Sequence, residues 1–265
     1  PKEKPNGLGL VFCVSGGWYS DRGMMGFARV DEFLRRGYTV FCVMHGSQPK
    51  FTIPEILSDM HRAVRFIKSK AKTYNVDPDR LGIYGGSAGG HLSLMQGTAG
   101  AAGDPKAGDP IDRLSSKVAA VACFFPPTDF LNYGKPGEIA LGNGVLKDFR
   151  APFDFTELDQ KTRHFVLITD ESKRQAIGKQ ISPLYHVTPD DAPSLIIHGD
   201  ADLLVPIQQA ELIVAALKKA NVPAELVVRK GKVHGWPEME KDYSILADWF
   251  DKHLAKKEHA AATKN

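Results

Sequence analysis

One serine in the sequence lies in a glycine-rich pentapeptide that suits a nucleophile. Residues 85–89 read Gly-Gly-Ser-Ala-Gly and fit the pattern G-x-S-x-G, with Ser87 at its centre. This pattern marks a sharp turn that holds a reactive serine between a strand and a helix. Residues 81–84 before it read as a short strand, and residues 91–96 after it as the start of a helix. Because large side chains beside such a turn would collide with both elements, the glycines favour a catalytic serine over the alternative, a glycine-rich turn with a surface serine.

The groups that could activate Ser87 come later in the chain. A serine hydroxyl is a weak nucleophile, so it needs a basic side chain beside it and an acid that orients the base. Asp200 and Asp202 follow one apolar segment, and His234 follows the next. The order serine, acid, histidine is the one expected when the serine sits on a turn of this kind. Since the two aspartates are two residues apart, only one of them should point at His234.

Nine histidines occur in the sequence, and several are alternatives to His234 as the base. His186 belongs to the long insertion described below, and His253 and His259 lie in the carboxyl-terminal helix and tail. His91 follows the glycines of the turn on the predicted helix, so packing or contact with a substrate is its expected role. His198 is expected to stabilise the loop that carries the two aspartates. His45 ends a predicted strand but precedes Ser87 in the chain, against the expected order. His234 therefore remains the predicted base.

A third requirement is a set of N–H groups for the negative charge that develops on a carbonyl oxygen under attack. One donor should be the amide of Ala88, directly after the nucleophile, and another should come from the loop after the first strand. That loop, residues 15–19, reads Ser-Gly-Gly-Trp-Tyr, and its glycines allow the backbone to turn its amides inward. We predict an oxyanion hole made by Ala88 and Gly17, with Gly16 or Trp18 beside them.

Alternating apolar and helical segments predict the framework that would bring these residues together. Six segments read as buried strands: residues 9–14, 39–44, 81–84, 118–125, 194–197 and 225–228. Helices are expected at residues 24–36, 54–74, 208–220 and 243–254, and from residue 91 onward. Strands that are apolar on both faces and alternate with helices form parallel sheets covered on both sides. We therefore predict an α/β fold with a mostly parallel sheet, and a site at the carboxyl ends of its strands.

Residues 130–186 interrupt this alternation, because they are far longer than a usual connection between sheet strands. Their mixed composition, with a possible helix around residues 162–168, argues against a disordered linker. We expect one domain over residues 1–265, with this insertion lying over the sheet as a lid or cap. The alternative is a decoration that faces solvent and has no function.

Several aromatic side chains and one histidine could line a pocket for the acyl or aryl group of a substrate. They are Trp18, Tyr19, His91, Phe149, Phe153 and Phe155. The three phenylalanines belong to the insertion, so the alternative is that they simply pack it onto the rest of the domain.

Composition excludes some classes of function. The chain has 34 basic and 31 acidic residues, a formal charge of +3, and no basic stripe of the kind that binds nucleic acid. No apolar run is long enough to span a membrane. Cys13, Cys42 and Cys123 each lie in an apolar run and read as core residues, and no cysteine–histidine cluster suggests a metal. The sequence begins with Pro1, so we expect a processed or trimmed form, secreted or periplasmic if a leader was removed.

The motifs resemble those of the esterase/lipase and prolyl-oligopeptidase-like branch of the α/β-hydrolases, which includes bacterial feruloyl- and acetylxylan-esterase-like proteins. The matching pieces, spread over residues 15–236, are SGGWY for the family's HGGGW, DPDRLGIYGGSAGGHLSL, SPLYHVTPDDAPSLIIHGDADLLVP and KVHGW. The resemblance implies the α/β-hydrolase fold, no cofactor, and Ser87, Asp202 and His234 as the triad. It selects Asp202 through the pattern H-G-x-x-D, which leaves Asp200 as a turn or capping residue. One departure is Val14-Ser15, where the family's oxyanion loop usually begins His-Gly.

These features together predict a serine carboxylic-ester hydrolase that forms an acyl-enzyme on small acyl or aryl esters. Feruloyl or acetyl esters of plant polysaccharides are among the candidate substrates. A serine peptidase of the prolyl-oligopeptidase kind is an alternative, although this sequence holds no propeller segment of the kind such peptidases use. A ligand-binding homologue without catalysis and an interaction module with an idle site are further alternatives. Homologues that only bind ligands usually lose a triad residue, and this sequence keeps all three.

Overall fold

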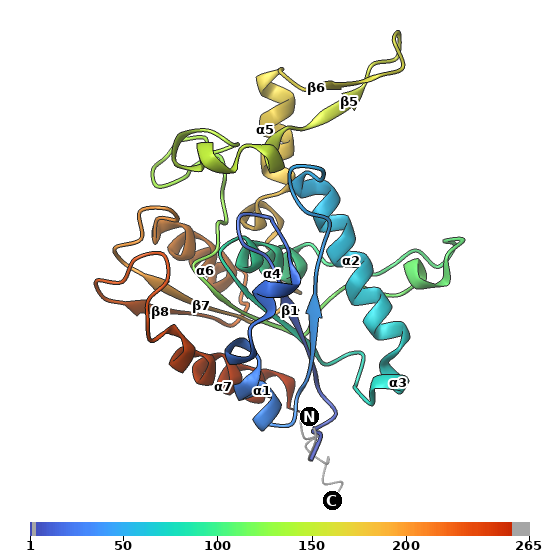
Figure 1. Ribbon diagram of the computed structural model, residues 1–265, viewed down its shortest axis with the longest axis vertical. Helices are drawn as coiled ribbons and strands as arrows, with labels where there is room; N and C mark the ends of the chain where they lie inside the picture. Colours follow the sequence, from blue (N-terminus) through green and yellow to red (C-terminus); the bar gives the residue numbers. More distant parts are fainter. Residues whose placement is uncertain (2–3, 256–265) are drawn as a thin grey trace, which may run out of the picture.

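The computed structural model describes residue 1 and residues 4–255, and its centre is a six-stranded sheet (Figure 1). The strand order is β2-β1-β3-β4-β7-β8 and every neighbouring pair is parallel. The strands are β1 (Gly9–Cys13), β2 (Thr39–Val43), β3 (Leu81–Gly86), β4 (Ala120–Phe124), β7 (Ser194–Gly199) and β8 (Ala224–Arg229). The predicted α/β fold with a parallel sheet is confirmed. The chain reverses its direction of strand addition after β2, so β1 and β3 flank the switch point where such sheets place ligand sites.

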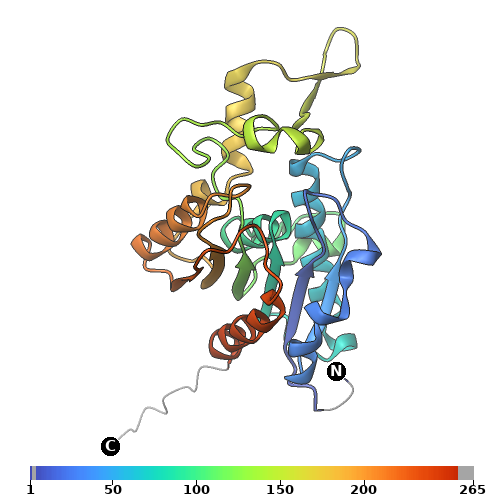
Figure 2. The same ribbon diagram turned by 60° about the vertical axis from the view of Figure 1, so that its left-hand side comes forward.

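Helices cover both faces of the sheet (Figures 1 and 2). One face packs against α2 (Ile53–Ser69), α3 (Ala71–Tyr74), α4 (Ala88–Thr98) and α6 (Gln208–Lys219), and the other against α1 (Asp31–Arg35) and α7 (Tyr243–Leu254). Successive strand residues point to opposite faces, so Val11 belongs to the first core and Phe12 to the second. This alternation explains why the strands are apolar along their whole length.

Two predicted helices differ from the structure near the amino-terminal half. Residues 24–36 do not form one helix: two 3₁₀ turns, Arg22–Met25 and Phe27–Arg29, precede the short α1. Gly26 separates them with φ +28° and ψ 122°, a conformation that no helix contains. Residues 54–74 likewise divide into α2 and α3 at Lys70. The apolar spacing predicts that both segments are helical, but the positions of the breaks depend on the backbone angles of Gly26 and Lys70.

Residues 130–186, which we term the cap, lie beyond the carboxyl edge of the sheet (Figures 1 and 2). They contain β5 (Thr156–Leu158), β6 (Phe165–Leu167), α5 (Glu171–Gln180) and three 3₁₀ turns. The helix predicted at residues 162–168 is wrong. Asp159 accepts hydrogen bonds from the amides of Lys161 and Thr162, which closes a turn there, and β6 follows it to pair with β5.

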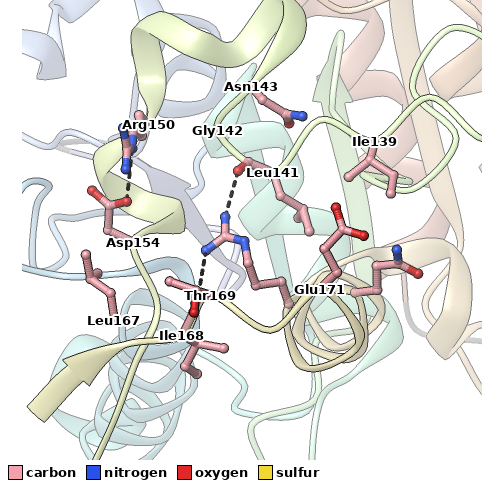
Figure 3. Close-up of a pocket in the computed structure, with 12 residues that line it drawn as sticks. Ile139, Leu141, Gly142, Asn143, Arg150, Asp154, Leu167, Ile168, Thr169 and Glu171 are labelled. Atoms are coloured by element: carbon pink, nitrogen blue, oxygen red, sulfur yellow. Dashed lines mark hydrogen bonds and ion pairs between the residues drawn. The ribbon is translucent and has the colours of Figure 1, made fainter.

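The cap holds an open cavity of about 470 Å³ (Figure 3). Its walls come from residues 139–154, from the end of β6 and from the first turns of α5. Arg174 of α5 crosses it and donates to the carbonyls of Leu141, Phe153 and Ile168, so this side chain holds three parts of the cap together.

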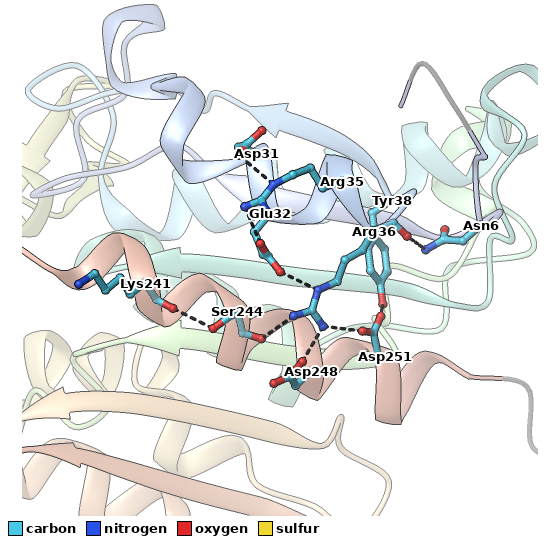
Figure 4. A network of polar contacts seen from close by, with 10 residues as sticks. All are labelled: Asn6, Asp31, Glu32, Arg35, Arg36, Tyr38, Lys241, Ser244, Asp248 and Asp251. Atoms are coloured by element: carbon cyan, nitrogen blue, oxygen red, sulfur yellow. Dashed lines mark hydrogen bonds and ion pairs between the residues drawn. The ribbon is translucent and has the colours of Figure 1, made fainter.

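An ion-pair network joins α1 to α7 at the opposite edge of the sheet (Figure 4). The Arg36 guanidinium contacts Glu32, Asp248 and Asp251, and the Tyr38 hydroxyl donates to Asp251 at 2.6 Å. These hydrogen bonds outweigh the opposing effect of burial and raise the pKa of Arg36. The first and last helices of the domain are thus fastened to each other just before β2 begins.

Candidate active site

Ser87 lies in a strained turn between β3 and α4. Its backbone angles are φ 55° and ψ −122°, which a residue with a side chain rarely adopts. The turn leaves no room for side chains around it: a Cβ on Gly85 would lie 2.6 Å from the backbone of Gly89, and one on Gly89 would lie 2.7 Å from the Cys13 carbonyl. The Ser87 amide donates to the Phe124 carbonyl at 3.0 Å, which anchors the turn to β4. The predicted strand–turn–helix context of the motif is confirmed.

Three loops bring Ser87, His234 and Asp202 together. The distance from His234 Nε2 to Ser87 Oγ is 2.9 Å, and that from His234 Nδ1 to Asp202 Oδ2 is 2.7 Å. Because a carboxylate only accepts, Nδ1 carries the hydrogen and Nε2 is left to accept the Ser87 proton. The arrangement can therefore deprotonate Ser87 as it attacks a carbonyl carbon.

Asp202 is buried, and both of its carboxylate oxygens have hydrogen-bond partners. Its Oδ1 accepts from the amides of Leu204 and Val205, both at 2.9 Å, and His198 Nε2 lies 3.5 Å from Oδ2. Burial alone would raise the pKa of Asp202, but hydrogen bonds from His198, His234 and the Val205 amide hold this pKa well below its ordinary range. The acid beside His234 therefore stays ionised.

Asp200 points elsewhere, as its predicted role as a turn residue requires. Its Oδ1 accepts from the Gly231 amide at 2.6 Å, and the next amide, that of Ala201, donates to the Lys232 carbonyl. Asp200 thus ties the loop after β7 to the loop that carries His234.

The predicted oxyanion loop folds back on itself. Gly17 and Trp18 both have positive φ, 55° and 59°, between a pair of hydrogen bonds that join Gly16 to Tyr19. The Gly16 amide donates to the Tyr19 carbonyl at 2.9 Å, so the prediction of Gly16 as a donor is corrected. Among the described residues, the amides of Gly17 and Trp18 have no acceptor. Ala88, the first residue of α4, has no acceptor within its helix either.

A family model described as BD-FAE matches residues 1–217 of the chain. The chain belongs to the BD-FAE family. Its curated relatives include the probable carboxylic ester hydrolase LipM and the esterase LipQ of Mycobacterium tuberculosis. LipM is 26% identical over 214 residues, 80% of this chain and 45% of LipM; LipQ is 25% identical over 80% of this chain and 46% of its own length. This BD-FAE chain thus spans about half the length of those relatives.

Solved structures share the fold of this BD-FAE chain. The bifunctional GH43-CE protein of Bacteroides eggerthii superposes with a TM-score of 0.78 at 22% identity, covering 96% of this chain and 32% of that one. The acetyl ester-xyloside bifunctional hydrolase of Caldicellulosiruptor lactoaceticus gives 0.72 at 23% identity, with 96% and 83% covered. Esterase 2 of Thermogutta terrifontis phosphonylated by sarin gives 0.74 at 23% identity, with 97% and 90% covered.

Four of the predicted pocket residues are buried in the BD-FAE chain and line no open pocket. Trp18, His91, Phe153 and Phe155 are at most 2% exposed. Trp18 Nε1 donates to His91 Nδ1 at 3.1 Å, and His91 Nε2 donates to the Ile181 carbonyl at 2.6 Å. Burial lowers the pKa of His91 to about 4, so this ring is neutral. The alternative, packing of the cap onto the domain, is the one the structure supports for these side chains.

The other two predicted pocket residues remain near the surface. Tyr19 is exposed, and Phe149 of the cap is half-buried against the oxyanion loop. A Cβ on Gly17 would lie 2.5 Å from the Phe149 ring, so the cap reaches the backbone of the predicted donors. The cavity in the cap (Figure 3) contains neither of these side chains nor any of the triad.

Phe125 is a site residue that the sequence reasoning missed. Its ring centroid lies 4.4 Å from that of His234, and its φ is +35°. It directly follows β4, which pairs with β3, the strand that leads into Ser87. This position after a strand next to β3 is the signal in the sequence that could have identified Phe125. Leu203 and Val233, next to Asp202 and His234 in the chain, are exposed apolar side chains.

Neither a metal site nor a membrane-spanning helix is found among the residues that the structure describes. No group of three or more histidine, cysteine, aspartate or glutamate side chains within residues 4–255 could hold a metal ion. Over the same residues, none of the helices has the length and apolar character that a membrane crossing requires.

Proposed function

We propose that this chain is a serine carboxylic-ester hydrolase that works through an acyl-enzyme. The observation that carries the proposal is His234, which hydrogen-bonds Ser87 through Nε2 and Asp202 through Nδ1. The similarity to LipM, a probable carboxylic ester hydrolase, and to the esterase LipQ supports the same reaction class.

In the proposed mechanism, Ser87 Oγ attacks the ester carbonyl carbon while His234 Nε2 takes its proton. The carbonyl oxygen becomes an oxyanion, which the amides of Ala88, Gly17 and Trp18 stabilise. His234 then gives the proton to the leaving alkoxide, the C–O bond breaks, and the alcohol departs. Water attacks the acyl-enzyme while His234 Nε2 takes its proton. His234 then returns this proton to Ser87 Oγ as the bond between Oγ and the acyl carbon breaks, and the acid is released. Asp202 keeps His234 in the tautomer that each step needs.

Small acyl and aryl esters are the proposed substrates, with acetyl and feruloyl esters of saccharides among them. Proteins that share this fold include an acetyl ester-xyloside bifunctional hydrolase and a carbohydrate esterase from gut microbiota, which motivates testing sugar esters first. The exposed side chains of Tyr19 and Leu203 and the partly buried Phe149 could contact such a substrate. The buried Trp18 and Phe153 would act only by supporting these surfaces.

Hydrolysis of p-nitrophenyl esters from acetate to decanoate, and of methyl ferulate, tests the proposal directly. We expect turnover by the wild type and a loss of at least ~10³-fold in kcat for Ser87→Ala, because the nucleophile is gone. Ser93→Ala is the matched control, since Ser93 donates to a helix carbonyl of α4. A wild type that is inert on every ester, or a Ser87→Ala variant as active as the wild type, would contradict the proposal. Peptide p-nitroanilides then test the peptidase alternative.

A further inference from the structure

The loop that follows β2 runs beside the oxyanion loop and is hydrogen-bonded to it along its length. β1 and β2 are parallel neighbours, so the loops after them, residues 14–20 and residues 44–52, leave the sheet at the same edge. The Ser20 amide donates to Ser47 Oγ at 2.8 Å, and the Gln48 amide donates to the Trp18 carbonyl at 3.2 Å. None of these contacts involves the triad.

Gln48 holds one peptide plane of the oxyanion loop. Its Nε2 donates to the Gly17 carbonyl at 3.3 Å. In a trans peptide the carbonyl and the following N–H point in opposite directions, so this bond turns the Trp18 N–H away from Gln48. The Tyr19 amide donates to the Gly16 carbonyl at 3.0 Å. By the same geometry, this bond sets the direction of the Gly17 N–H. Both proposed donors are therefore oriented by bonds to the carbonyl that precedes them.

The hydrogen bonds between Gly16 and Tyr19 supply part of this orientation, and the neighbouring loop supplies the rest. Trp18 has φ 59°, a left-handed conformation that is unfavourable for a residue with a side chain. A loop free to relax would leave this conformation and turn its amides elsewhere. The contacts from residues 45–48 oppose that relaxation.

Ser15 and His45 form a second brace at the base of the loop. Ser15 Oγ lies 2.8 Å from His45 Nε2, and His45 Nδ1 lies 2.6 Å from the Gly46 carbonyl. Since a carbonyl only accepts, Nδ1 carries the hydrogen and Nε2 accepts the Ser15 hydroxyl proton. Both side chains are buried, and the Gly46 amide is itself held by Asp59 of α2. His45 lies just beyond β2 (Thr39–Val43), so the loop after that strand supplies this brace as well.

We propose that Gln48 and the Ser15–His45 pair are positioning residues that aim the Gly17 and Trp18 amides at the oxyanion. This inference rests on the proposed function and goes beyond it, because it assigns the precision of the oxyanion hole to the loop after β2. It predicts a loss in the chemical step rather than in substrate binding, since the oxyanion exists only in the transition state and intermediate.

The test compares Gln48→Ala and Gln48→Glu with the wild type on p-nitrophenyl acetate. Removing one oxyanion donor costs ~10²–10³-fold in kcat, and a misaligned donor should cost less, so we expect kcat to fall roughly 10- to 100-fold with KM within about threefold. Gln48→Glu keeps the side-chain length, but its carboxylate cannot donate to the Gly17 carbonyl, so it should be as slow as Gln48→Ala. Gln160→Ala, on the exposed turn between β5 and β6, is the control.

The second brace is tested with Ser15→Ala and Ser15→Thr. Ser15→Thr keeps the hydroxyl and should retain kcat, whereas Ser15→Ala should lose it by a similar factor to Gln48→Ala. A trifluoromethyl ketone, which forms an oxyanion on addition of Ser87, should bind more weakly in proportion to the loss of kcat/KM. Thermal unfolding identifies any variant that has lost its fold. If Gln48→Ala or Ser15→Ala does not fold, the comparison is made with Gln48→Glu, which is also expected to be slow.

The outcomes separate the two proposals. An inactive wild type refutes the esterase, whatever the variants do. An active wild type whose folded Gln48 variants keep kcat within twofold, or change only KM, refutes the positioning role and leaves the esterase standing. A loss of kcat with proportionally weaker ketone binding supports both.

Discussion

At the scale of single residues, one hydrogen position decides whether His234 can act. Asp202 fixes it by accepting from Nδ1, and an asparagine there could donate instead and favour the other tautomer. Loss of the orienting acid costs ~10⁴-fold in kcat in the well-studied serine protease triad. We expect Asp202→Asn to lower kcat by roughly 10³- to 10⁴-fold with little change in KM, measured on p-nitrophenyl acetate. Asp200→Asn keeps the oxygen that accepts from Gly231, so it should stay near wild-type activity.

The same residue sets an expectation for pH. The pKa of Asp202 is depressed in the folded chain, so its stabilising effect is present above the unfolded pKa, ~3.9, and is lost as pH falls through the lower folded value. Asp202 is therefore ionised throughout the ordinary carboxyl range and above it. It should add no ionisation to the acid limb of kcat/KM, and a limb with a slope of two would contradict this expectation.

At the scale of elements, the turn between β3 and α4 packs so closely against β1 that it has room for backbone atoms but not for a side chain at Gly89. A Cβ on Gly89 would lie 2.7 Å from the Cys13 carbonyl, which is part of β1 and cannot swing aside. Gly89→Ala should therefore cost ~1–3 kcal/mol of stability, or roughly 2–10 °C in Tm, with a fall in kcat as Ser87 shifts. Gly108→Ala is the matched control, because a Cβ there meets nothing within 4 Å. Calorimetry showing equal Tm for both variants would contradict the account.

Elements also show what local sequence could and could not predict. Apolar runs such as residues 81–84 predicted strands well, since a strand buried on both faces is apolar throughout. The break at Gly26 and the turn at Asp159 escaped prediction, because each depends on one residue overriding the helical pattern around it. Burial of Trp18 escaped for another reason: its partner Phe153 lies in the cap, 135 positions further along the chain. Contacts of that range leave no local signal.

At the scale of the whole molecule, the triad lies at the carboxyl ends of the sheet strands, and the ion-pair network around Arg36 lies at their amino ends. The triad occupies loops after β3, β7 and β8, whereas Arg36 lies before β2 and joins α1 to α7 (Figure 4). Stability and activity should therefore respond separately to changes at the two ends of the strands.

Replacing Arg36 tests this separation. Its side chain is only 25% exposed and its guanidinium contacts Glu32, Asp248 and Asp251, so Arg36→Ala leaves three carboxylates without their shared partner. We expect a loss of roughly 1–3 kcal/mol in the free energy of unfolding, from hydrogen bonds to charged groups, with kcat per folded molecule unchanged.

Arg35 supplies the matched control, because its ion pairs with Asp31 and Glu32 come from a side chain that is 66% exposed. Exposed pairs contribute at most ~1 kcal/mol, so Arg35→Ala should lower Tm less than Arg36→Ala. Added salt should reduce the difference in Tm between Arg35→Ala and Arg36→Ala only in part, since the Arg36 side chain is shielded from solvent. Equal losses in both variants would show that the network adds no more than a surface pair. A fall in kcat for Arg36→Ala alone would show instead that the α1–α7 junction and the triad are coupled through the sheet.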